Sequence, residues 1–218
     1  MPTKTVPPWG GRDDVTRYDV PDALWPTDNK WGVPLLDLKM QARAFDQPWA
    51  MWGSTKRKTT IKGTYLFYTE DYRYERLWKD PAPLLRTKCT NAVEPNFSCY
   101  ENMPAAVALW QVYRKRWIAR WWQSYGVRII VDLNVARNHE GVNLLGVPRG
   151  WRVFATRGYE DRLEDTHREY AIADQIAGDN ATPIFIVYGG GLAVKEACTA
   201  NGWIWIAENM DVGKGRDI

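Results

Sequence analysis

The chain has 218 residues, of which 45% are hydrophobic and 25% charged, and these values are typical of one globular domain. The net charge of +3, from 29 basic and 26 acidic residues, permits nucleic-acid binding but is smaller than that of strongly basic nucleic-acid-binding domains. Charge breaks every apolar run well before the roughly 20 residues that span a bilayer. The N-terminus lacks the apolar core of a secretory signal, so we expect no membrane contact and a cytoplasmic location.

Cysteine and histidine are scarce and scattered. Cys89, Cys99 and Cys198 have no Cys-x-x-Cys spacing, and His139 and His167 stand alone. This excludes a disulfide framework and predicts that there is no structural zinc site. No serine or cysteine lies beside a histidine in a pattern that indicates nucleophilic catalysis.

The first 63 residues have an irregular pattern. Prolines at seven positions exclude long regular elements, and tryptophans recur between them. We interpret residues 1–63 as an extended Trp- and Pro-rich arm that packs on the domain, with one short helix near 35–45. The arm ends in a basic segment, which is either a solvated turn or a nucleic-acid contact formed by Lys56, Arg57, Lys58 and Lys62.

Residues 64–209 alternate between strand and helix patterns. The clearest helix runs from Ala105 to Tyr125, between Pro104 and Gly126. Further helices are predicted at 160–177 and 192–200, and strands at 64–69, 91–94, 127–131, 151–155, 183–188 and 203–207. This alternation predicts an α/β domain with a mostly parallel sheet, as an open sheet or partial barrel with helices packed on it, followed by a polar tail at 210–218.

Polar residues follow the predicted strands. In parallel α/β folds, ligands bind beyond the carboxyl ends of the strands, so our candidate catalytic residues are Glu70, Asp71, Asn96 and Asp132. Other polar residues at these ends are Ser98, Asn134, Thr156, Tyr188 and Glu208. Such an acidic rim suits Mg²⁺ or an acid–base pair, although polar residues also gather there simply because turns begin there. No other cofactor is indicated.

The long helix carries interleaved aromatic and basic residues. Trp110, Arg114, Trp117 and Trp121 share one face by their spacing. If that face is packed, which an amphipathic helix favours, Arg114 needs an acidic partner, and the rim carboxylates are candidates. If the face is exposed, it suits single-stranded nucleic acid, with Arg116 and Arg120 as further contacts.

A glycine run precedes the last predicted helix. The backbone N–H groups of Gly189-Gly190-Gly191 could face a phosphate, but the run has neither the P-loop ending nor the spacing of a dinucleotide site. A tight turn explains it equally well.

Several short motifs occur in a characteristic order. They are Tyr68-x-Glu70-Asp71, Pro95-Asn96-Phe97-Ser98, Trp122-Gln123-x-x-Gly126 and Val187-Tyr188-Gly189. Over roughly residues 64–190 this series resembles an uncharacterised family, a domain of unknown function, of phages and bacterial mobile elements. The resemblance implies such an origin but no established activity. The family pattern has Asp where this chain has Asn96, which would remove a carboxylate from any family site.

Three functions follow as hypotheses. The first is a phage or mobile-element accessory protein that acts with nucleic acid in replication or genome maintenance. The second is a metal-assisted hydrolase of a phosphate-containing substrate that uses the acidic rim. The third is an interaction protein, such as an inhibitor of a host protein, that uses the Trp-rich arm. The sequence does not determine the oligomeric state.

Overall fold

A single curved sheet of parallel strands organises the computed structural model, which describes residues 25–53, 61–179 and 181–208. The strands pair in chain order, and every neighbouring pair is parallel. They are β1 (Trp49–Met51), β2 (Thr64–Leu66), β3 (Asn91–Val93), β4 (Arg128–Asp132), β5 (Val153–Arg157), β6 (Ile184–Tyr188) and β7 (Ile204–Ile206). The predicted α/β class with a parallel sheet is confirmed.

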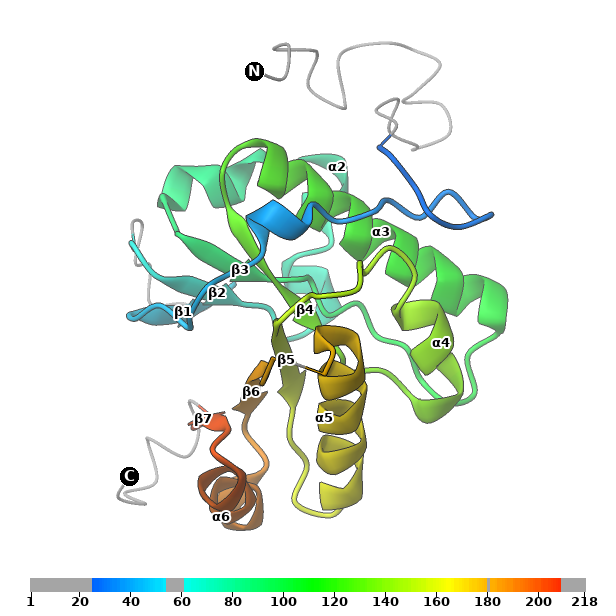
Figure 1. Ribbon diagram of the computed structural model, residues 1–218. Helices are drawn as coiled ribbons and strands as arrows, with labels where there is room; N and C mark the ends of the chain where they lie inside the picture. The colour runs from blue at the N-terminus through cyan, green and yellow to red at the C-terminus, as the bar shows by residue number, and fades with distance from the viewer. Residues whose placement is uncertain (1–24, 54–60, 180, 209–218) are drawn as a thin grey trace, which may run out of the picture.

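The helices lie on the outer side of the curved sheet, as Figure 1 shows. Right-handed crossovers between strands in sequential order place every helix on one face, and strand twist then curls the sheet towards a barrel. Between β1 and β7 no pairing occurs in the described residues, so the sheet is an open half-barrel. The helices are α2 (Arg76–Lys79), α3 (Ala105–Ser124), α4 (Glu140–Asn143), α5 (Leu163–Ala177) and α6 (Gly191–Asn201), with short 3-10 turns η1 (Leu38–Met40), η2 (Asp71–Arg73), η3 (Ala82–Thr87) and η4 (Arg137–His139).

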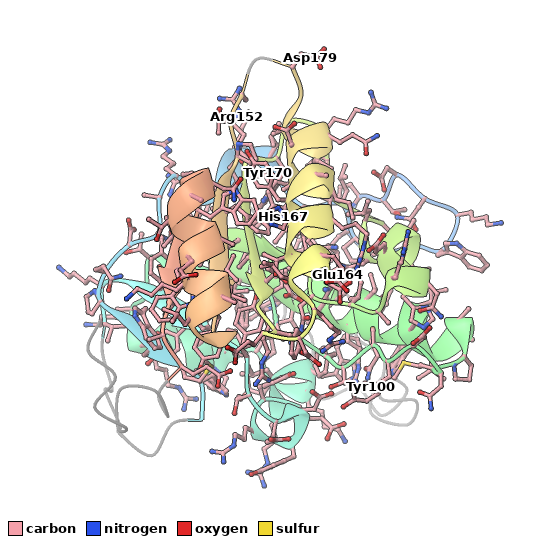
Figure 2. The ribbon with its side chains drawn as sticks, turned by 90° about the horizontal axis from the view of Figure 1, so that it is seen from below. Tyr100, Arg152, Glu164, His167, Tyr170 and Asp179 are labelled. Atoms are coloured by element: carbon pink, nitrogen blue, oxygen red, sulfur yellow. The ribbon has the colours of Figure 1, made fainter. Side chains whose placement is uncertain are left out.

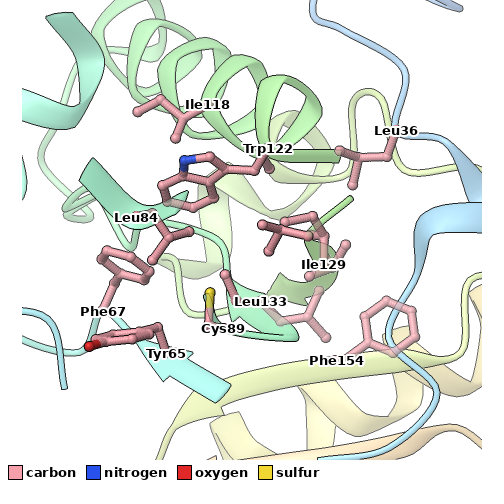
Figure 3. Packing of buried hydrophobic residues seen from close by; sticks show 14 of the residues in the cluster. Leu36, Tyr65, Phe67, Leu84, Cys89, Ile118, Trp122, Ile129, Leu133 and Phe154 are labelled. Atoms are coloured by element: carbon pink, nitrogen blue, oxygen red, sulfur yellow. The ribbon is translucent and has the colours of Figure 1, made fainter. Parts of the chain in front are cut away.

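Strand alternation divides the apolar residues into an outer and an inner cluster. In the outer cluster, Phe67, which directly follows β2, stacks on Trp122 of α3 with ring centroids 5.5 Å apart (Figure 3). The inner cluster fills the concave side, where Tyr68 and Tyr188 stack at 5.5 Å across the half-barrel. Trp49 of β1 packs edge-on against Tyr188 at 6.3 Å, so side chains from distant strands support the inside of the sheet.

The long helix α3 is enclosed by the rest of the fold. Its residues from 114 to 119 are all buried, and Trp117 and Trp122 are fully buried. The helix begins after Pro104 and is followed by Gly126, whose φ of +92° suits a chain reversal. The predicted packing of the aromatic face is therefore confirmed at Trp117 and Trp121, whereas Trp110 remains 40% exposed.

Two details in the N-terminal segment differ from the sequence-based expectation. β1 lies within the stretch that we expected to be irregular and pairs with β2 from Trp49↔Thr64 to Met51↔Leu66. The short helix expected near 35–45 is only the single turn η1, which Asp37 caps by accepting a hydrogen bond from the Lys39 backbone N–H. The predicted polar tail at 210–218 and the basic residues Lys56, Arg57 and Lys58 lie outside the described residues.

Candidate functional site

A cavity of about 460 Å³ opens at the carboxyl ends of β2 to β5. This is the edge where α/β folds place their ligands. Its wall is built by the segments that follow these strands and by the first turns of α5. Residues 69–71, 96, 98–101, 134–137, 157, 159, 162, 165, 168 and 169 line it.

The structure brings several predicted site residues into this cavity. Glu70, Asp71 and Asn96 line it together with Ser98 and Asn134. Asp132 is fully buried and is not part of the lining. Of the remaining rim residues, Glu208 forms an ion pair with the cavity-lining Arg157 at 3.1 Å. Thr156, Tyr188 and Glu208 are not part of the lining themselves.

Asp132 belongs to a buried ion pair. Lys115 Nζ lies 3.1 Å from Asp132 Oδ2 and also donates to the Asp132 carbonyl oxygen, and both side chains are almost completely inaccessible. The Tyr68 hydroxyl donates to Asp132 Oδ1 at 3.0 Å. Burial raises the pKa of Asp132 and the Lys115 ammonium opposes that rise, while burial and then Asp132 raise the pKa of Tyr68. This pair is a structural support of β4.

Asn96 links this buried pair to the cavity. In the amide orientation that satisfies both ends, its Nδ2 donates to Asp132 Oδ2 and to the Asn134 carbonyl oxygen, each at 3.2 Å. Its Oδ1 then accepts from Asn134 Nδ2 at 2.9 Å. An amide suits this position because it can donate to a carboxylate, whereas an aspartate there would face a second negative charge.

Asp71 is the most firmly oriented carboxylate of the lining. Its Oδ1 accepts from the Ser98 hydroxyl at 3.0 Å, and its Oδ2 accepts from the Ser98 backbone N–H at 3.0 Å. The Tyr74 hydroxyl lies 2.8 Å from Oδ1 and shares its proton between this oxygen and the Asn96 carbonyl oxygen. Three donors from two segments fix the carboxylate in one orientation. A fixed orientation is what a general base or a ligand-binding carboxylate requires.

Two basic residues of α3 that we singled out from the sequence have other roles. Arg116 is fully buried, forms an ion pair with the equally buried Glu94 and donates to the carbonyl oxygens of Asn143 and Leu145. Because it is buried and paired, Arg116 is not available for the nucleic-acid contact that we predicted. Arg114 pairs with Glu75 at 3.5 Å, so its acidic partner is not one of the candidate rim carboxylates.

The other predicted nucleic-acid contacts in the described residues, Arg120 and Lys62, differ in their exposure to solvent. The guanidinium of Arg120 lies over the ring of Trp25 at 4.8 Å, and its side chain is only partly accessible. Lys62 is exposed, next to the undescribed segment that holds the rest of the basic loop.

Four arginines line the cavity, and they differ in their partners. Arg157 pairs with Glu208, and Arg168 with Glu140 and Asp165. Arg162 lies over the Tyr159 ring at 4.0 Å, with only a loose contact of 3.9 Å to its exposed neighbour Asp161. Arg137 is exposed and has no hydrogen-bond or ion-pair partner in the described part of the chain. Arg137 and Arg162 are therefore available to an anionic ligand.

The described residues form neither a metal-binding cluster nor an open phosphate-binding loop. Residues 25–53, 61–179 and 181–208 contain no group of three or more His, Cys, Asp or Glu that could hold a metal ion. At the glycine turn, a Cβ on Gly189 would lie 2.6 Å from the Glu208 carboxylate, and one on Gly191 would lie 3.0 Å from the Glu160 carboxylate. Carboxylates occupy the space beside this turn, so it is a close-packed turn.

Sequence reasoning missed several residues that surround the site. Lys115 of α3 and Glu94, which follows β3, belong to two separate buried ion pairs around β4, and Glu169 of α5 lines the cavity although it is only 4% exposed. The arginines at and beyond the ends of β4 and β5 were also missed. Their signal was available, because Arg157 ends β5 while Arg137 and Arg162 follow strands, as the predicted carboxylates do.

The fold and site define a half-barrel α/β protein with a polar, arginine-containing cavity at the carboxyl ends of its strands. Within the described residues, no helix is both long and apolar enough to cross a bilayer. Residues 25–186 match the family described as Domain of unknown function (DUF4417), so the chain belongs to that family. The predicted resemblance to an uncharacterised phage family is confirmed.

Curated relatives come from mycobacteriophages. The Gene 1 protein of Mycobacterium phage L5 is 38% identical over 120 residues, which cover 54% of this chain and 47% of the relative. The Gene 1 protein of Mycobacterium phage D29 is 32% identical over 108 residues, which cover 49% of this chain and 40% of the relative. The matches thus span less than half the length of these relatives. No solved structure matches the chain significantly.

Proposed function

We propose that the chain is an enzyme that binds a nucleotide-type, phosphate-bearing substrate in the strand-end cavity and uses Asp71 as its general base. The observation that carries this proposal is that one cavity is lined by a firmly oriented carboxylate and by two available arginines. Cavities of a few hundred Å³ with few convergent polar groups are typical small-molecule sites.

Arg137 and Arg162 favour a phosphate as the anchoring group. They approach from different segments, η4 and the start of α5, so a phosphate between them could accept charge-assisted hydrogen bonds from both. The other two lining arginines are neutralised by Glu208, Glu140 and Asp165, so they add little to the attraction of an anion.

Tyr100 favours a base or another flat group as the second part of the ligand. Its side chain is 63% exposed at the cavity edge, beyond the end of α5 that carries Glu164, as Figure 2 shows. Stacking on an exposed aromatic ring is a common contact for nucleobases. A nucleotide or a nucleic-acid end would connect this cavity to the role in phage replication or genome maintenance that we predicted from the sequence.

Asp71 would take a proton from a water or hydroxyl group that attacks the bound phosphate. We propose Mg²⁺ only as an ion that arrives with the substrate, held by phosphate oxygens and water. A role as a host-protein interaction surface stays a prediction, to which the 55% exposed Trp31 is relevant.

Equilibrium titration with a nucleoside monophosphate, the matching nucleoside and inorganic phosphate tests the proposal. Because each charge-assisted hydrogen bond contributes about 1.5 to 3 kcal/mol, Arg137→Ala with Arg162→Ala should weaken monophosphate binding by at least about tenfold. The matched control is Arg86→Ala with Arg152→Ala, which removes the same charge from exposed arginines outside the cavity; Figure 2 places Arg152 at the opposite end of α5 from Tyr100. Equal affinity in both double variants, or no binding at all, would refute the proposed site.

A further inference from the structure

Glu169 is a buried carboxyl group in the wall of the candidate cavity. It lies on the face of α5 that packs on β5, is 4% exposed and lines the cavity beside Arg168 and Asp165. Its Oε2 accepts a hydrogen bond from the Thr156 hydroxyl at 2.5 Å. Within the described residues the Thr156 hydroxyl is the only hydrogen-bond partner of the Glu169 side chain, and Oε1 accepts no hydrogen bond.

Arg168 is the cation that favours a negative charge on Glu169, but it is engaged by other carboxylates. Its guanidinium is directed to Glu140 and Asp165, and no ion pair joins that guanidinium to Glu169 in the part of the chain that the structure describes. The other ionisable groups near Glu169 are the hydroxyl of Tyr68, which follows β2, Asp132 of β4 and Asp165 of α5 itself.

A buried carboxylate without a cation is costly, and such a group keeps its proton. Burial raises the pKa of Glu169 well above its ordinary value. The hydrogen bond from Thr156 and the charge of Arg168 oppose that rise, and the charges of Asp132 and Asp165 add to it. Two carboxyl groups of one cavity thus differ in environment, since Asp71 has three hydrogen-bond donors and Glu169 has one. Such a difference separates acid from base in enzymes with two carboxyl groups.

We propose that Glu169 is the proton donor of this cavity and acts together with Asp71, which lines the same cavity. The inference rests on the proposed function. In hydrolysis of a phosphate ester, a water oxygen forms a bond to phosphorus while Asp71 takes one water proton. The bond from phosphorus to the ester oxygen breaks, its electron pair stays on that oxygen, and Glu169 supplies the proton that makes the leaving alcohol neutral. The proton on Asp71 returns to solvent and Glu169 is reprotonated from solvent, so the net reaction consumes one water.

The protonation state of Glu169 can be measured without a substrate. In protein carrying carbon-13 at the glutamate carboxyl groups, NMR spectra from about pH 4 to about pH 9 follow each glutamate relative to its ordinary pKa of about 4.3. One resonance should titrate at a clearly higher pH than the resonances of the exposed glutamates, and it should be missing from the Glu169→Gln variant. The exposed Glu196 serves as reference, with Glu196→Gln for its assignment. A Glu169 resonance that titrates together with that of Glu196 would overturn the proposal.

Turnover separates proton donation from a purely structural role. Glutamine at 169 can still accept the Thr156 hydrogen bond and has nearly the same volume, but it cannot transfer a proton. On nucleoside phosphate esters, Glu169→Gln should lower kcat by about 10² to 10⁴ for an alkyl leaving group and much less for dinitrophenol, which leaves without a proton. Equal loss for both leaving groups, or no loss, would overturn the proposal.

Failure of this inference differs from failure of the proposed function. An ionised Glu169 in a protein that binds the monophosphate through Arg137 and Arg162 refutes only the proton donor. Absence of monophosphate binding refutes the proposed function whatever the state of Glu169. Binding without turnover of any ester by the unaltered protein refutes the reaction and, with it, the role of Glu169.

Discussion

Replacing Lys115 by methionine tests the buried ion pair beneath the candidate site. The substitution keeps an unbranched chain of similar length but leaves Asp132, which is 0% exposed, without a cation. Removing one partner of a buried pair costs about 3 to 5 kcal/mol, a large part of the roughly 5 to 15 kcal/mol that stabilises a typical domain. We therefore expect Lys115→Met to fold with much reduced stability at neutral pH.

The loss should depend on pH with a definite sign. Without Lys115 the pKa of Asp132 in the folded state rises further above the unfolded value of about 3.9. Below its unfolded-state pKa, a carboxyl group with a raised folded-state pKa is protonated in both states and costs no stability. As pH rises from the unfolded-state pKa through the folded-state pKa, the free energy of unfolding falls. The deficit relative to the unaltered protein should thus be smallest near pH 4 and largest at neutral pH.

Urea unfolding followed by tryptophan fluorescence measures the free energy of unfolding at each pH. The matched control is Lys115→Met combined with Asp132→Asn, which removes both charges and should recover most of the loss at neutral pH. A deficit below about 1 kcal/mol, or one that does not change with pH, would refute the view that charge pairing supports Asp132.

Three further variants test other parts of the structure. Gly146→Ala places a Cβ 2.1 Å from the Pro34 carbonyl oxygen at a φ of +75°, whereas at Gly126, with a φ of +92°, the added Cβ meets open space. Thermal unfolding should therefore show a much larger loss of stability for Gly146→Ala than for Gly126→Ala. Equal losses of stability would refute the close approach of Gly146 to Pro34. Asn96→Asp adds a carboxylate beside Asp132, and urea unfolding should show a loss at neutral pH that shrinks towards pH 4; a loss independent of pH would contradict the contact. Oligonucleotide titrations at several salt concentrations test whether the basic loop contacts nucleic acid, with alanine at Lys56, Arg57, Lys58 and Lys62. This variant should bind more weakly and with a flatter salt dependence. Unchanged binding would refute the contact.

The parallel sheet could be predicted from the sequence because its longer strands are apolar runs that end in polar residues. The runs before Asp132, Arg157 and Gly189 each became a strand of the half-barrel. β1 could not be predicted in this way, because the strand itself has only three residues and is defined by its pairing with β2. A strand of this length has no periodicity of its own.

The candidate site could be predicted only in part, because sequence spacing locates strand ends but does not show which helical residues are buried. Glu70, Asp71 and Asn96 follow strands directly, so the rule for strand ends located them. Lys115 and Arg116 lie in a helix that is enclosed on several sides, and sequence spacing does not distinguish such a helix from one with a solvated basic face. Glu169 belongs to a charged helical stretch that reads as exposed, and only the packing of α5 on β5 reveals that it is buried.

A crystal structure of the protein with a bound nucleoside monophosphate would locate the ligand. We expect the phosphate within hydrogen-bonding distance of Arg137 and Arg162, with the base against Tyr100 and the Asp71 carboxylate facing the phosphorus. A nucleotide bound on another surface while this cavity stays empty would refute the proposed site.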